Sequence, residues 1–299
     1  MSNTAHSFQA RPTEILLNKV SELPTLPTII YELSRLINNP MSSTKSIEQV
    51  MVKDQSLTTK VLKLANSAYY AIPGGVTTVA RAIGFLGFDT VNQIVLSTSI
   101  IKAFKGPAGV KFDINQLWQH AIGVAMASET IGKFIRYQKS PDLFTCGLVH
   151  DMGKVILCQV DPELLGVIIQ TAAENKSTFL EAERKLKTTT HMQLGAILAK
   201  RWQLPMAIQS CIAFHHEESP ERRSGLSAEL GKSVDIVYLA NILIHELHFG
   251  NSGHDKVVAA PNEILERLGI KADQMPELMK KIEEHLEQAE SFLNIIQST

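Results

Sequence analysis

The chain has 299 residues, 44% of them hydrophobic and 20% charged, and its formal net charge at pH 7 is -1. This composition is typical of a soluble globular protein with about two domains or one large one. A net charge so close to zero gives no electrostatic basis for nucleic-acid binding, so we expect no direct nucleic-acid partner. Lys, Asp or Ser interrupts the most apolar stretches well short of about 18 residues, so we also expect no membrane association.

The ends and the cysteines of the chain point to a cytoplasmic protein. Residues 1–11 contain no apolar signal core, and residues 1–13 are polar and are expected to be flexible. The three cysteines are widely spaced among apolar neighbours, which indicates buried reduced thiols. They are Cys146, Cys158 and Cys211.

The first half of the chain, residues 14–108, reads as successive helices. Pro27 opens one helix, Ser46 opens the next by capping-box spacing, and Asp54 caps a third. A short helix over 78–86 is expected to stop at Gly87, and Asp89 then caps a long one. The break at 106–109 separates this lobe from a second one over residues 109–250.

The second half continues with helical periodicity, and no β-branched alternation is sustained. We therefore predict an all-α fold in two lobes. The expected helices cover residues 114–137, 143–160, 162–175, 178–186, 190–202, 205–216 and 233–249.

Residues 251–299 form a loop and an amphipathic helix. Apolar residues recur there at alternating spacings of four and three, which is a heptad pattern. They are Met275, Met279, Ile282, Leu286, Ala289, Leu293 and Ile296. One interpretation is a helix docked on its own domain. The alternative is a helix that forms a homodimer.

The sequence CGLVHDMGK, residues 146–154, carries the strongest functional signal. His150 and Asp151 together bind hard to borderline divalent metals such as Mg, Mn, Fe or Zn. Lys154 follows Asp151 by three residues, so both lie on one helical face, where an ammonium can hold a phosphate oxygen beside a metal. Alternatively, Lys154 only neutralises a helix end.

Other histidines stand on the neighbouring predicted helices. His120 precedes the His-Asp pair, and His191 and the adjacent His215 and His216 follow it. A single histidine on an apolar face is usually a core residue, and His215-His216 could instead be a solvated helix end. Helical bundles, however, build metal sites from side chains on facing helices, so we expect these residues to converge in the second lobe.

With this order of histidines, the chain resembles the HD superfamily of metal-dependent phosphohydrolases and, within it, the regulatory HDOD branch. The similarity covers residues 14–250 and implies a single all-α unit in two lobes, the second of them HD-like. The stretches that carry it are LPTLP (23–27), VKDQSLT (52–58), VLKLANSAYY (61–70), ARAIGFLG (80–87) and WQLP (202–205), with His215-His216 beyond.

The resemblance implies a metal site. In catalytic HD proteins, the positions that match His120, His150 and Asp151 bind one or more metals. In the HD-GYP branch, the positions that match His191, His215 and His216 join them, and the position of Lys154 contacts phosphate. The implied reaction is attack on phosphorus by a metal-activated water, with Asp151 and Lys154 as catalytic residues.

Asn241 departs from the catalytic pattern. HD enzymes carry an aspartate after an alanine on a late helix, whereas this chain reads Leu239-Ala240-Asn241. An amide offers a carbonyl oxygen but cannot neutralise a dication, and Asp235 lies on a different helical face. The Gly-Tyr-Pro motif of the cyclic-dinucleotide phosphodiesterases is also absent from the sequence.

Three functions follow as alternatives. The first is a bacterial signal-transduction module, without catalysis or weakly catalytic, that acts through signalling proteins or a nucleotide or phosphate ligand. The second is a metal-dependent phosphohydrolase that uses the retained cluster, and the third is an oligomerisation scaffold. The expected cofactor is a divalent metal, Fe, Mn, Mg, Ni or Zn, and otherwise none. The candidate metal ligands are His120, His150, Asp151, His191, His215, His216 and Asn241.

Overall fold

The structure is a computed structural model of the chain. It describes residues 43–104, 112–137, 142–223 and 225–297, together with Leu16, residues 18–20, Leu23, Glu32, Leu33 and Leu36. All regular elements in these ranges are α-helices or 3-10 helices, which confirms the all-α prediction. The predicted flexible segment 1–13, most of the helix predicted from Pro27 and the predicted lobe boundary at 106–109 lie outside the described residues.

The described part of the N-terminal lobe consists of α3 (Thr44–Met51), α4 (Gln55–Ala65) and α5 (Val79–Ala103). The predicted start at Ser46 is wrong, because Ser43 caps α3 and its side chain accepts a hydrogen bond from the Ser46 N–H. Asp54 caps α4 as predicted, with its Oδ1 2.9 Å from the Leu57 nitrogen. Gly87 interrupts α5 with φ 84° and ψ 165°, a conformation that glycine adopts without a steric penalty.

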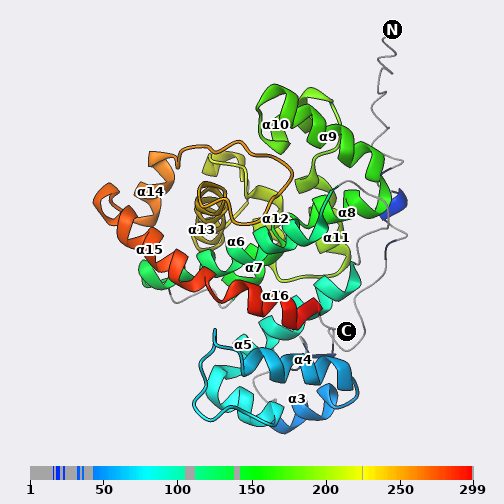
Figure 1. Ribbon diagram of the computed structural model, residues 1–299, viewed down its shortest axis with the longest axis vertical. Coiled ribbons are helices and arrows are strands. Elements are labelled where there is room, and N and C mark those ends of the chain that lie inside the picture. The colour runs from blue at the N-terminus through cyan, green and yellow to red at the C-terminus, as the bar shows by residue number, and fades with distance from the viewer. Residues whose placement is uncertain are drawn as a thin grey trace.

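In the second lobe α13 packs against α6, α7 and α12 (Figure 1). The helices α6, α7 and α8 bury most of their residues. The predicted loop over 219–232 is shorter in the structure, because α13 begins at Ala228. The three cysteines are buried as expected, and Trp118 and Trp202 are buried as well. The helices are α6 (Ile114–Phe134), α7 (Leu143–Val149), α8 (Met152–Val160), α9 (Pro162–Asn175), α10 (Phe179–Lys185), α11 (His191–Arg201), α12 (Met206–Phe214) and α13 (Ala228–Glu246), with the 3-10 turn η1 (Pro220–Arg222).

The single helix predicted over 143–160 is wrong, because His150 and Asp151 form a turn between α7 and α8. On a continuous helix, adjacent side chains point about 100° apart, whereas the turn lets this pair face one site. Close helix crossings fix the turn on both sides. A Cβ at Gly147 would lie 2.6 Å from the Cα of Ala125 on α6, and one at Gly153 would lie 1.8 Å from the carbonyl oxygen of His191.

The C-terminal segment forms α14 (Asn262–Leu268), the turn η2 (Ala272–Gln274), α15 (Met275–Leu286) and α16 (Ala289–Gln297). The continuous heptad helix is therefore wrong, because the chain breaks between α15 and α16. Both helices pack on α6, and α16 also contacts α4 and α5, between the two lobes (Figure 1). Leu278, Ile282 and Phe292 are fully buried there. Docking on the chain's own domain is thus confirmed, and the homodimer stays a prediction.

Two stretches are long and apolar enough to cross a membrane, contrary to the sequence-based expectation. They are Val79–Ala103 and Leu143–Val160. In the second, 94% of the apolar window is buried inside the protein. A core helix of a soluble domain meets the same length and hydropathy criteria, so these stretches do not indicate a membrane protein.

Candidate metal centre

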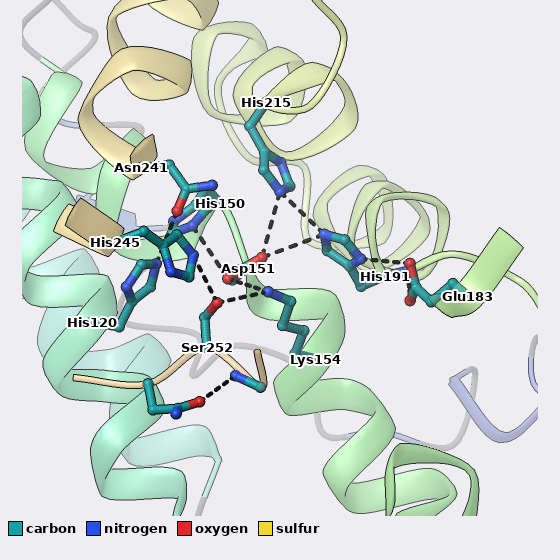
Figure 2. Close-up of polar contacts among 12 residues, drawn as sticks. His120, His150, Asp151, Lys154, Glu183, His191, His215, Asn241, His245 and Ser252 are labelled. Carbon is teal, nitrogen blue, oxygen red and sulfur yellow. Dashed lines mark hydrogen bonds and ion pairs between the residues drawn. The ribbon is translucent and has the colours of Figure 1, made fainter. Parts of the chain in front are cut away.

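The turn between α7 and α8 brings Asp151 to the centre of a buried cluster of histidines (Figure 2). His150 comes from the same turn, and Lys154 from the first turn of α8. His191 is the first residue of α11, and His215 and His216 directly follow α12. His215 is 1% exposed and His216 is partly buried, so the alternative of a solvated helix end is wrong.

Asp151 contacts three imidazoles and one ammonium. Its Oδ1 lies 3.4 Å from the Nε2 atoms of both His191 and His215. Its Oδ2 lies 3.3 Å from His150 Nε2 and 2.8 Å from Lys154 Nζ. The carboxylate therefore contacts His150, His191 and His215 from one position.

Hydrogen bonds on the far side of each ring fix the orientation of the three imidazoles. His150 Nδ1 donates to the Gly147 carbonyl at 2.6 Å, and His215 Nδ1 lies 3.1 Å from the Ile212 carbonyl. His191 Nδ1 donates to Glu183 Oε2 at 2.8 Å, and the other oxygen of Glu183 accepts the His191 backbone N–H. A neutral imidazole that donates through Nδ1 keeps a lone pair on Nε2. The Nε2 atoms of all three rings therefore face Asp151, where a lone pair on each could bind a metal.

Several hydrogen-bond acceptors in the cluster have no donor facing them. The Nε2 atoms of His191 and His215 face each other at 3.2 Å. His150 Nε2 and Asp151 Oδ1 are buried and have no hydrogen-bond partner within the described part of the chain. Buried polar atoms without partners are costly, whereas a cation would satisfy them all. A metal therefore fits the residues present, and its ligand atoms would lie within 4.8 Å of one another in the set Asp151, His191, His215 and His216.

Burial and neighbouring charges set protonation states that suit a metal. Burial lowers the pKa of His215 to about 3 and the pKa values of His120 and His216 well below the ordinary range. Burial by itself would raise the pKa of Asp151, but Lys154 and His150 outweigh it and hold that pKa well below its usual range. Neutral imidazoles and an ionised carboxylate are the forms that bind metals.

His120 and Asn241 pair with each other at the α6–α13 side of the site (Figure 2). His120 Nε2 lies 3.0 Å from Asn241 Oδ1, and an amide oxygen can only accept, so this ring nitrogen carries the proton. An amide turned over would instead donate to the same nitrogen. In either orientation Asn241 is hydrogen-bonded to His120 Nε2. One potential ligand atom of His120 also lies within 4.8 Å of potential ligand atoms of His150 and Asp151.

Asp235 cannot replace the absent carboxylate. It accepts hydrogen bonds from Arg223 at 2.7 Å and from Arg267 at 2.8 and 2.9 Å. The same arginines bind the carbonyls of residues 217 and 218, directly after His215-His216. Asp235 therefore anchors the chain that leaves the site.

Lys154 points toward Asp151 and not toward open space. Its Nζ also lies 3.3 Å from Ser252 Oγ and 4.7 Å from the centre of the Phe179 ring. Ser252 Oγ lies 3.1 Å from His245 Nε2, and the His245 ring stacks on His254. The contact of Lys154 with phosphate stays a prediction.

No pattern in the sequence pointed to Glu183, Ser252 or His254. Glu183 stands in the charged stretch EAERK, which reads as a solvated helix face, yet its side chain is fully buried against His191. Ser252 and His254 lie in a stretch rich in glycine, which reads as a connecting loop. Only the tertiary structure brings these side chains to the cluster.

The fold and the site together define a class of protein. Successive helices of one bundle carry histidines and a His-Asp turn to a common buried point, as in metal sites of the HD type. Comparison with protein families matches the HDOD domain over residues 23–218, which is more than half of the chain. The chain therefore belongs to the HDOD family.

Similar proteins agree with this assignment. An HDOD domain protein of unknown function from Geobacter sulfurreducens superposes with a TM-score of 0.75 at 24% identity, over 94% of this chain and 99% of that one. A candidate phosphohydrolase from Shewanella amazonensis SB2B superposes with a TM-score of 0.72 at 26% identity, over 95% of this chain and 98% of that one. A candidate signal transduction protein from Marinobacter aquaeolei VT8 superposes with a TM-score of 0.75 at 21% identity, over 95% of this chain and 65% of that one.

A curated relative is larger than this chain. It is an uncharacterized protein from Treponema pallidum (strain Nichols), 25% identical over 262 residues. The match covers 87% of this chain, and the chain spans about half the length of that relative, 48%.

Proposed function

We propose that this protein is a signal-transduction module with a metal-binding HD-type site that is non-catalytic or only weakly catalytic. The observation that carries the proposal is the bond between His120 and Asn241. A neutral amide stands where catalytic HD proteins have a carboxylate, and it also occupies the ring nitrogen of a neighbouring candidate ligand. Asparagine at this position thus removes an anion from the site and fixes His120 through its Nε2 atom.

The opposite side of the site supports retention of a metal. Asp151, His191, His215 and His216 offer one carboxylate and three imidazoles, a donor set that suits Fe, Mn, Zn or Ni better than Mg, which prefers oxygen ligands. When bound, such an ion supplies positive charge that polarises water or a phosphoryl oxygen. Glu183 and the Gly147 carbonyl hold the rings in place for it.

The runner-up function is a metal-dependent phosphohydrolase. The specific observation in its favour is the Lys154–Asp151 contact at 2.8 Å, which holds a cation beside the candidate metal position. If the site is active, Asp151 and Lys154 are the expected catalytic residues. The scaffold alternative has less support, because α15 and α16 bury their apolar residues within the chain.

The proposed partners are signalling proteins, with a nucleotide or phosphate as the small ligand, and the proposed location is the cytoplasm. The family assignment supports the first proposal. The three buried cysteines support a reducing compartment. Nothing in the charge of the chain favours nucleic acid.

Metal content and turnover test the proposal together. Protein purified without chelator and without nickel-affinity resin should contain about one metal per chain, and the Mn²⁺-loaded form should hydrolyse bis-p-nitrophenyl phosphate poorly. Asn241→Asp should tighten Mn²⁺ binding by about tenfold, equal to about 1.4 kcal/mol, because it restores an anion beside the metal position. Asn262→Asp, which adds the same charge at an exposed position, is the matched control. Robust turnover by the unaltered protein would overturn the proposal in favour of the enzyme.

A further inference from the structure

A cleft between α5 of the N-terminal lobe and the helices α6 and α7 shares none of its lining residues with the histidine cluster. Its volume is about 300 Å³, the lower end of the range of about 300–1,000 Å³ in which proteins bind small molecules. The cleft is therefore a second place in the molecule where a ligand could bind.

The helices on either side supply polar residues to this cleft in pairs. Gly87 divides α5 into two helical segments, and Asp89 and Gln93 lie one turn apart on the second of them. Glu129 and Lys133 have the same spacing on α6. Both pairs line the cleft. A molecule bound there would thus contact both lobes.

Gln93 is a buried amide that borders the cleft without a hydrogen-bond partner. The residue is 5% exposed, and its side chain makes no hydrogen bond within the part of the chain that the structure describes. A carboxamide offers an oxygen that accepts and an NH₂ group that donates. Buried polar groups are nearly always hydrogen-bonded, so this amide points to a polar ligand in the cleft.

Two carboxylates near the cleft face each other's charge without a cation between them. The side chain of Asp89 makes no ion pair among the described residues. Asp142 directly precedes Leu143 of the cleft wall, and its side chain does not cap α7 although it stands at the N-cap position. Burial and the nearby charge of Asp89 raise the pKa of Asp142. A cation beside them would relieve this repulsion.

Glu129 adds a third carboxylate from α6. Its Oε2 accepts a hydrogen bond from the Tyr69 hydroxyl and lies 3.9 Å from Lys133 Nζ. The Lys133 side chain is 70% exposed, so water screens this ion pair and it contributes little. The cleft therefore has more negative charge than its single ammonium neutralises.

The three carboxylates do not suit one metal ion. Within the described ranges, the groups of histidine, cysteine and acidic ligand atoms that lie within 4.8 Å of one another include none of Asp89, Glu129 and Asp142. A longer cation with several N–H donors can reach carboxylates that are further apart. Its alkyl part would lie against Leu86 and Leu143, which are the apolar wall of the cleft.

We infer that this cleft binds a small aliphatic diamine, whose ammonium groups donate to Asp89, to Glu129 and to the amide oxygen of Gln93. The site is separate from the metal centre and does not depend on the function proposed for it. A bound diamine would contact α5 and α6 at once and hold the two lobes against each other. The protein would then respond to an organic cation in addition to any signal at the metal centre.

Calorimetric titration of putrescine into the full chain tests the inference. The unaltered protein should bind putrescine saturably and should bind the uncharged diol of the same length at least about tenfold more weakly. Asp89→Asn and Gln93→Met should each weaken putrescine binding by about tenfold. The matched control is Asp113→Asn, which removes the same charge at an exposed helix cap that asparagine also serves, and it should leave the affinity unchanged.

The outcomes separate a diamine site from the alternatives. Absence of putrescine binding, equal affinity for the diol, or full affinity in both variants would overturn the inference. Displacement of putrescine by equimolar Mg²⁺ would overturn it in favour of a metal site. Asp89 is exposed, so Asp89→Asn should fold even if Gln93→Met does not. Mn²⁺ affinity should be the same in all variants, so a failure of the proposed metal site would leave this result unaffected.

Discussion

The two sides of the metal centre hold their imidazoles in different ways. On the α11–α12 side, His191 and His215 present unprotonated Nε2 atoms to each other at 3.2 Å, and outer hydrogen bonds hold both rings. On the α6–α13 side, His120 Nε2 is hydrogen-bonded to the side-chain amide of Asn241 at 3.0 Å. The comparison teaches that the two sides differ in charge as well as in hydrogen bonding. The α6–α13 side has a neutral amide at position 241, whereas the α11–α12 side has the carboxylates of Asp151 and Glu183 beside its imidazoles.

The largest expected effect comes from removing the residue that both sides share. Asp151→Asn should lower the free energy of unfolding of the metal-free protein by about 3–5 kcal/mol, because Lys154 loses its buried counter-charge. Urea denaturation with chelator present measures this loss, and metal analysis should show an empty site. Asp161→Asn is the control, since it also removes a buried carboxylate, at the start of α9, but should spare the metal. Metal retention by Asp151→Asn would contradict the central role given to this carboxylate.

The next effect compares one histidine from each side. His191→Ala should weaken Mn²⁺ binding by more than about 100-fold, because the loss of an outer partner alone costs about 10–100-fold. His120→Ala should weaken it by less than about threefold, because His120 lies outside the set of Asp151, His191, His215 and His216. In the Asn241→Asp background the cost of His120→Ala should rise. Equal losses from His191→Ala and His120→Ala in the unaltered background would show that both sides bind metal.

A smaller effect is expected from the residue that orients His191. Glu183→Gln keeps the size of the side chain but removes the charge that accepts from Nδ1 at 2.8 Å. Mn²⁺ affinity should fall by about 10–100-fold, as for other outer partners of metal-binding histidines. Glu181→Gln, on the exposed face of the same helix, is the control, because glutamine can also serve in its capping box. Unchanged affinity in Glu183→Gln would mean that packing alone orients the ring.

The smallest effect concerns pH and the α6–α13 side. The pKa values of His245 and His254 are about 3 in the folded protein, against an ordinary value of 6.5. Between pH 6.5 and 3 the unfolded chain therefore binds protons that the folded chain does not, and the free energy of unfolding falls as the pH falls. His254→Gln should make this dependence shallower by up to about 1.4 kcal/mol per pH unit. Urea unfolding of metal-free protein at pH 7.0 and 5.5 measures it, and an unchanged slope would show that His254 is not buried as neutral.

Local sequence signals predicted the helices well where local chemistry decides them. Asp54 caps its helix through its carboxylate, and Gly87 interrupts one because it tolerates a positive φ. Two larger errors lie at 143–160 and 275–296, where apolar periodicity continues across a short break and only packing against other helices reveals the turn. The order of the histidines predicted which residues meet, since successive helices of one bundle converge. The pairing of Asn241 with His120 and the burial of Glu183 depend on contacts that no local pattern encodes.

Gly153 has a consequence for how such sequences are interpreted. The glycine between Asp151 and Lys154 lies where α8 crosses the start of α11, and any side chain there would collide with the backbone of His191. A lineage that keeps this crossing must keep the glycine, whether or not its members still bind a metal. Packing thus explains part of the HDMGK motif at residues 150–154. The motif alone is therefore weak evidence for catalysis, and the residue at position 241 on α13, an amide or a carboxylate, is more informative about it.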